Sequence, residues 1–113
     1  MLVAGCSKSP PAIAGGKSVE HWLSVLRGPD AKERIEAVRK LGNIGTKDKA
    51  ALPAAFTALT DPEPAVRKEA IFVAVRNRRG SGPAMPVLAR MKTEDPDSEI
   101  RRLAEEAHGN LTH

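Results

Sequence analysis

Apolar side chains recur at helical spacing in three consecutive segments of the chain, from Ser18 to near Leu111. Each segment predicts a short apolar helix, a turn that contains proline and a second, amphipathic helix. The segments read H-W-L-S-V-L-R-G-P-D-A-K-E-R-I-E-A-V-R-K-L-G, L-P-A-A-F-T-A-L-T-D-P-E-P-A-V-R-K-E-A-I-F-V-A-V and M-P-V-L-A-R-M-K-T-E-D-P-D-S-E-I-R-R-L-A-E-E-A-H. Because one such hairpin cannot bury its apolar stripe alone, the pattern predicts an all-α fold, an α-solenoid (superhelix) of about three stacked helical hairpins.

The spacing of matched residues supports an internal repeat. Pro62 lies 33 residues after Pro29, and Pro96 lies 34 residues after Pro62. The arginines at 34, 67 and 101 and the alanines at 37, 70 and 104 follow the same steps. We therefore expect one domain over 18–113, with repeats at approximately 18–47, 48–80 and 81–111. The preceding stretch, 1–17, contains Pro10-Pro11 and Gly15-Gly16, which predict a flexible tether.

Residues that favour helix ends give the expected boundaries. Asp30, Asp61 and Asp95 are predicted to cap the second helices, because a carboxylate there can accept hydrogen bonds from free amides. Leu41-Gly42 and Arg79-Gly80 are predicted helix ends, where glycine could adopt a left-handed cap.

Two of the turns carry a recognisable motif, D-P-E-P-A-V-R-K-E-A and D-P-D-S-E-I-R-R-L-A. With the repeat plan, these motifs resemble the HEAT family in its short bacterial form. In that family an aspartate six residues before an arginine forms a ladder between stacked repeats. The resemblance therefore implies a protein-binding scaffold with a ladder at Asp61, Arg67, Asp95, Arg101 and Arg34, although Gly28 stands where the first aspartate would be.

The second helices are expected to line the concave face, and one of them carries an unusual residue. Phe72 occupies the place that Arg39 holds in the first repeat and Glu106 in the third. Lys68 and Arg76 lie one turn either side of Phe72 on the same helix face. An aromatic ring rimmed by cations is a candidate contact for an acidic and apolar protein segment, so we predict a partner site at Phe72, Lys68, Arg76 and Arg39.

Composition leaves a second interpretation open. The chain has a formal net charge of +4 and 3% aromatic residues. Arginines 76, 78 and 79, with Arg39 and Lys40, could hold nucleic acid in a cytoplasmic protein, but the basic patch lacks the interleaved aromatics of dedicated binders. The repeats also resemble those of phycobilisome-lyase-type proteins, so an accessory subunit of such an enzyme is a further alternative.

The single cysteine lies in a short motif near the N-terminus. Leu2-Val3-Ala4-Gly5-Cys6 resembles the lipobox of bacterial lipoproteins, in which the cysteine is diacylated. The resemblance implies lipid attachment at Cys6 and a periplasm-facing location in the bacterial cell envelope, provided that the true start lies upstream. Otherwise Cys6 is a plain thiol on a cytoplasmic protein.

No pattern in the sequence specifies catalysis, a metal ion or a cofactor. Gly16-Lys17-Ser18 lacks the earlier glycine of a phosphate-binding loop, because Pro11 stands there. The three histidines have no partner at metal-ligand spacing, and the cluster of Asp95, Asp97 and Glu99 lacks the turn glycine of a calcium loop. We expect a non-enzyme without a small-molecule substrate.

Overall fold

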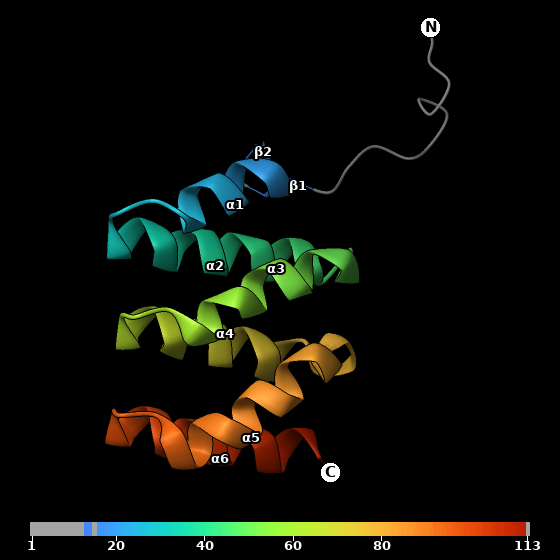
Figure 1. Cartoon of the computed structure of the whole chain (residues 1–113). Helices are drawn as coiled ribbons and strands as arrows, with labels where there is room; N and C mark the ends of the chain where they lie inside the picture. The colour runs from blue at the N-terminus through green and yellow to red at the C-terminus, as the bar shows by residue number, and fades with distance from the viewer. Residues whose placement is uncertain (1–12, 15, 113) are drawn as a thin grey trace, which may run out of the picture.

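The computed structural model describes residues 13–14 and 16–112 of the chain. The described residues form a two-stranded antiparallel hairpin followed by α-helices joined by short turns, several with 3-10 geometry (Figure 1). The strands are β1 (Ile13–Ala14) and β2 (Lys17–Ser18). The α-helices are α1 (Val19–Leu26), α2 (Ala31–Gly45), α3 (Leu52–Phe56), α4 (Pro64–Arg76), α5 (Met85–Glu94) and α6 (Ser98–Leu111).

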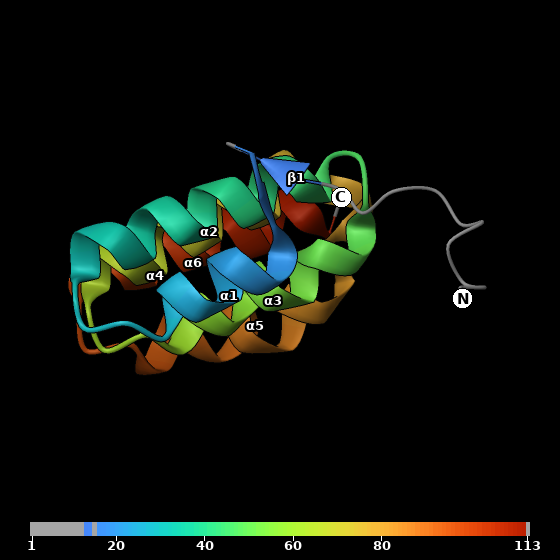
Figure 2. The same ribbon diagram turned by 90° about the horizontal axis from the view of Figure 1, so that it is seen from above.

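The α-helices pair into three antiparallel hairpins, α1 with α2, α3 with α4, and α5 with α6. The hairpins stack one on another through contacts of α2 with α4 and of α4 with α6 (Figure 1). Seen along the stack, the first helices lie on one side and the second helices on the other (Figure 2). The predicted all-α solenoid of three helical hairpins is confirmed.

One continuous core runs through the stack, and small or branched aliphatic side chains fill it. Ala37, Ala70 and Ala104, which share one place in the repeat, have no exposed surface. Alanine at this place lets the helices approach closely, because it adds little volume between them. The largest fully buried side chains come from all three hairpins, namely Leu41, Ile44, Leu52, Leu59, Ile71, Leu88, Ile100, Val38, Val66 and Val73.

The first hairpin carries two features at the N-terminal end of the stack. Trp22 is buried, and its ring meets the ring of His21 edge-on with a centroid distance of 4.8 Å. Strand β1 and the first residue of β2 fall within the predicted tether, 1–17, so regular structure begins earlier than the sequence indicated. Gly16 has a φ of 75° in their connecting turn, a conformation that glycine adopts without steric cost.

The helix caps agree with the prediction at Asp30 but not at the other two aspartates. Asp30 caps α2 by accepting a hydrogen bond from the amide of Lys32 at 2.9 Å. The caps of α4 and α6 are Glu63 and Asp97, two residues after the predicted positions. Asp61 and Asp95 instead accept from the amides of Glu63 and Asp97, each at 2.9 Å, and thereby fix the turns that precede these helices.

The helix ends predicted at Gly42 and Gly80 were wrong. Helix α2 continues through Gly42 to Gly45, and Gly80 ends a short 3-10 segment, Arg78–Gly80. Among the described residues, only Gly16 has a positive φ. These glycines serve packing instead, because a Cβ on Gly42 would lie 2.7 Å from Cγ2 of Val73 and a Cβ on Gly80 would collide with Leu52.

Candidate partner-binding face and inter-repeat ladder

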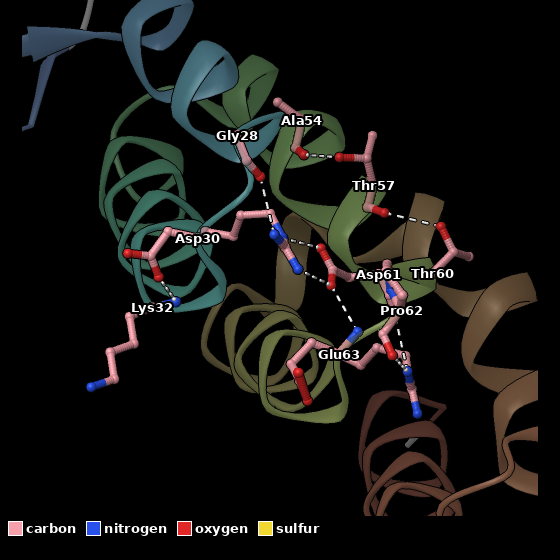
Figure 3. Close-up of polar contacts among 11 residues, drawn as sticks. Gly28, Asp30, Lys32, Ala54, Thr57, Thr60, Asp61, Pro62 and Glu63 are labelled. Atoms are coloured by element: carbon pink, nitrogen blue, oxygen red, sulfur yellow. Dashed lines mark hydrogen bonds and ion pairs between the residues drawn. The ribbon is translucent and has the colours of Figure 1, made fainter.

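The first rung of the ladder joins α2 to the turn before α4. Nε of Arg34 donates to Oδ2 of Asp61 at 2.9 Å, and Nη2 donates to Oδ1 at 3.2 Å (Figure 3). Both side chains are largely buried, with 14% and 8% of their surface exposed. The hydrogen bonds that Arg34 donates to the Asp61 carboxylate raise the pKa of the Arg34 guanidinium, although burial opposes this shift. The fork-shaped pairing therefore fixes the second hairpin against the first.

The second rung joins α4 to the turn before α6 and is more deeply buried. Nη2 of Arg67 donates to Oδ1 of Asp95 at 2.9 Å. Nε of Arg67 lies 2.8 Å from Oδ2 of Asp95, but its N–H is not aligned with an acceptor, so this contact is an ion pair only. This rung occupies the same repeat position as the first and ties the third hairpin to the second.

Each ladder arginine also contacts the backbone of its own turn. Nη1 of Arg34 donates to the carbonyl of Gly28, Nη1 of Arg67 to that of Asp61, and Nη1 of Arg101 to that of Asp95, at 2.7 to 3.0 Å. Gly28, labelled in Figure 3, stands where the other repeats have an aspartate. Its contact with Arg34 uses only the backbone carbonyl, so it forms without an aspartate side chain.

Arg101 forms no ion pair within the described part of the chain.

The three stacked hairpins correspond to a known repeat family. A model of HEAT repeats matches residues 19–109, which covers all three helical hairpins. The chain belongs to the HEAT-repeat family. Neither the curated proteins nor the solved structures that were searched include a match to this chain.

The second helices of these HEAT repeats form a face with an apolar groove between α4 and α6. Phe72 and Val75 are 39% and 38% exposed, and within the described residues they are the large apolar side chains with the most exposure. They line a groove of about 310 Å³ with Leu103 of α6 as a further apolar wall. Arg76, Glu106 and Asn110 also line this groove.

The cations predicted around Phe72 all have carboxylate partners within the chain. Nη2 of Arg39 lies 3.2 Å from Glu69 Oε1, and Nη2 of Arg76 lies 3.9 Å from Glu69 Oε2. Nζ of Lys68 lies 3.6 Å from Glu99 Oε2. Glu69 therefore joins α2 to the C-terminal turn of α4, while Lys68 joins α4 to α6. Arg76 is the predicted cation that also lines the groove.

Sequence reasoning missed three residues of this face. Val75 was not singled out, because its apolar character is ordinary in a helix and only the packing reveals its exposure. Leu103, which forms a wall of the groove, stands at the repeat position of Glu69 and Glu36, so the repeat register could have marked it. Glu69 could not have been assigned to Arg39 and Arg76 without the stacking geometry.

Cys6, the candidate for lipid attachment, lies outside the described residues. In the part searched, no three His, Cys, Asp or Glu side chains come together as potential metal ligands. The helices that are described include none with the length and apolar character needed to cross a bilayer.

Proposed function

We propose that this HEAT protein is a non-catalytic adaptor that binds a segment of another protein on the face formed by α2, α4 and α6. The observation that carries the proposal is the adjacent exposure of Phe72 and Val75 in one groove. HEAT arrays in general serve as protein-binding surfaces, and stacking of the repeats creates an extended face for this purpose.

The groove offers the features of a small binding hot spot. An exposed aromatic ring beside a hollow lets a partner side chain exclude water from both surfaces. Arg76 at the rim can meet a carboxylate of the partner, although it would share its charge with Glu69. The partner is therefore expected to present an apolar side chain with an acidic residue nearby.

The proposal extends to a lipid tether at Cys6. The sequence Leu2-Val3-Ala4-Gly5-Cys6 supports diacylation, and the segment after it contains the proline and glycine residues usual in a tether. An adaptor held in this way would collect its partner at the bacterial cell envelope. In this proposal the protein uses no cofactor and transforms no substrate.

Affinity purification with matched variants tests the partner face. Val75→Glu places a charge in the groove, whereas Ala65→Glu places the same charge on an exposed position of the same helix. Both variants should keep the melting temperature of the wild type within a few degrees, because both sites are exposed. The wild type and Ala65→Glu should retain a defined protein that Val75→Glu loses. If all three retain the same proteins in the same amounts, the groove is not the binding site.

A further inference from the structure

The turns of the stack lie at two opposite edges, and these edges differ in charge. One edge holds the turns within hairpins, 27–30, 57–63 and 95–97, and the other holds the turns between hairpins, 46–51 and 77–84 (Figures 1 and 2). We call the second edge the repeat edge. The turns within hairpins contain one cation, Arg27, and the carboxylates Asp30, Asp61, Glu63, Asp95 and Asp97. The repeat edge contains one carboxylate, Asp48, and the exposed cations Lys47, Lys49, Arg78 and Arg79.

Most carboxylates on the edge that holds the turns within hairpins, the acidic edge, have a role in the fold, whereas three of the four cations on the repeat edge form no ion pair in the described chain. Four of the five carboxylates cap helices, fix turns or pair with ladder arginines. On the repeat edge Lys47, Lys49 and Arg79 have no ion pair in the described chain, and Asp48 is engaged with the amide of Ala50. The dipoles of α2 and α4 favour cations near their ends, but this effect fades beyond the last turn, and these helices end before Lys49 and Arg79.

A pocket of about 340 Å³ opens between the two turns of the repeat edge. Lys49, Arg76 and Arg79 line it from three separate elements, and no carboxylate lines it. Arg76 also pairs with Glu69, so Lys49 and Arg79 are the lining cations without an ion pair in the described chain. Leu52 also lines it, between Gly45 and Gly80, and a Cβ on either glycine would collide with Leu52. The two glycines therefore let the backbone approach Leu52 closely. The pocket beside Leu52 is lined by cations, and a pocket with this charge suits one phosphate group.

The described chain also starts at this edge. Strand β1 packs against α2 and lies near the end of α2 from which the first turn of the repeat edge leaves (Figure 2). Cys6 precedes Ile13 by seven residues. Even a fully extended segment of that length spans at most roughly 25 Å, so a lipid on Cys6 would hold this edge close to the bilayer. This one step rests on the proposed tether, whereas the charge and the pocket do not.

We propose that the repeat edge binds the anionic surface of a phospholipid membrane, with a headgroup phosphate in the pocket between Lys49 and Arg79. Each lysine or arginine near such a surface strengthens binding, and salt weakens it. The opposite, acidic edge then faces away from the membrane. The groove at Phe72 and Val75 lies on the side of the stack between the two edges and stays open to a protein partner.

Vesicle co-sedimentation tests the proposal with the full, unacylated chain, so that failure of the lipid tether cannot affect the result. The two probes are vesicles of phosphatidylcholine alone and vesicles that also contain phosphatidylglycerol, each at low and high salt. The variants are Lys49→Glu/Arg79→Glu and the control Arg27→Glu/Arg90→Glu, which changes the net charge equally at exposed sites off the repeat edge. Both should melt as the wild type does. If the first variant is less stable, Lys49→Gln/Arg79→Gln replaces it.

We expect salt-sensitive binding to the phosphatidylglycerol vesicles that the control retains. The neutral Lys49→Gln/Arg79→Gln variant should bind about 30-fold more weakly, and charge reversal should weaken binding further. Absence of wild-type binding to the anionic vesicles would overturn the proposal, as would equal losses in the edge variant and its control. Tighter binding to duplex DNA than to the vesicles at equal salt would overturn it in favour of nucleic acid. Inhibition of vesicle binding by inorganic phosphate would support a phosphate in the pocket.

Discussion

Arg67 and Asp95, 28 residues apart in the sequence, meet at the boundary between the second and third hairpins. Nη2 of the arginine donates to Oδ1 of the aspartate at 2.9 Å, and only 7% of Arg67 and 8% of Asp95 is exposed. The aspartate also accepts from the amide of Asp97, so one carboxylate fixes a turn and joins two repeats. Stacking in this small HEAT protein thus depends on polar contacts as well as on aliphatic packing.

The buried rung predicts a large loss of stability when one partner loses its charge. Asp95→Asn leaves the Arg67 guanidinium buried without a counter-charge, which should lower the free energy of unfolding by about 3–5 kcal/mol. Glu99→Gln is the control, because it breaks the exposed pair with Lys68 and should cost at most about 1 kcal/mol. Urea denaturation followed by circular dichroism compares them. Equal midpoints for the two variants would show that the rung contributes little.

Two glycines at the same repeat position predict opposite effects of substitution by alanine. A Cβ on Gly42 would lie 2.7 Å from Cγ2 of Val73, so Gly42→Ala should destabilise by about 1–3 kcal/mol through overpacking. A Cβ on Gly109 would meet nothing within 4 Å, so Gly109→Ala should stabilise α6 by about 0.5–1 kcal/mol. Thermal unfolding measures both. A stabilised Gly42→Ala variant would contradict the packing at α2 and α4.

The two phenylalanines separate partner binding from folding. Phe56 is 6% exposed, so Phe56→Ala should cost about 3–5 kcal/mol. Phe72→Ala should cost clearly less, because its ring is 39% exposed, but should weaken partner binding at least about tenfold. Calorimetry measures the loss of stability in both variants, and titration with the recovered partner measures the loss of affinity in Phe72→Ala. Intact binding with a sharp fall in melting temperature for Phe72→Ala would assign the ring to packing alone.

The lipid tether predicts a defined mass at the N-terminus. If the proposed tether exists, protein expressed in its host from the gene with its upstream DNA should begin at Cys6 and carry a diacylglyceryl group, because a lipobox directs cleavage before the modified cysteine. Intact mass spectrometry of the N-terminal fragment reads this directly, and Cys6→Ala should abolish the modification. An unmodified chain that begins at Met1 with a free thiol would refute the tether.

The stack of three hairpins could be predicted because the residues that specify each hairpin recur at a regular spacing in the sequence. The spacing of Pro29, Pro62 and Pro96 set the register, and the same steps placed Arg34 and Arg67 at the rungs. The helix caps were predicted wrongly in two turns, because the repeat spacing alone does not determine which residue caps a helix. Asp61 and Asp95 precede the caps because their carboxylates serve the turn and the arginine at once.

The partner face was less predictable, because its properties depend on contacts between repeats. Phe72 could be singled out, since charged residues hold its place in the other repeats. The sequence could not show that Glu69 would approach both Arg39 and Arg76, which changes the expected cationic rim into a partly neutralised one. Gly42 was misread as a helix end because the contact with Val73 comes from another repeat.

Site-specific photo-cross-linking tests the central claim, that the groove beside Phe72 holds a protein partner. A benzophenone amino acid is placed at residue 75 in the groove, and at residue 90, an exposed position on α5, as the control. Irradiation in the host cells should give a discrete adduct of one protein from position 75 and none from position 90. The same adducts from both positions, or no adduct from position 75 in a correctly folded protein, would contradict the claim.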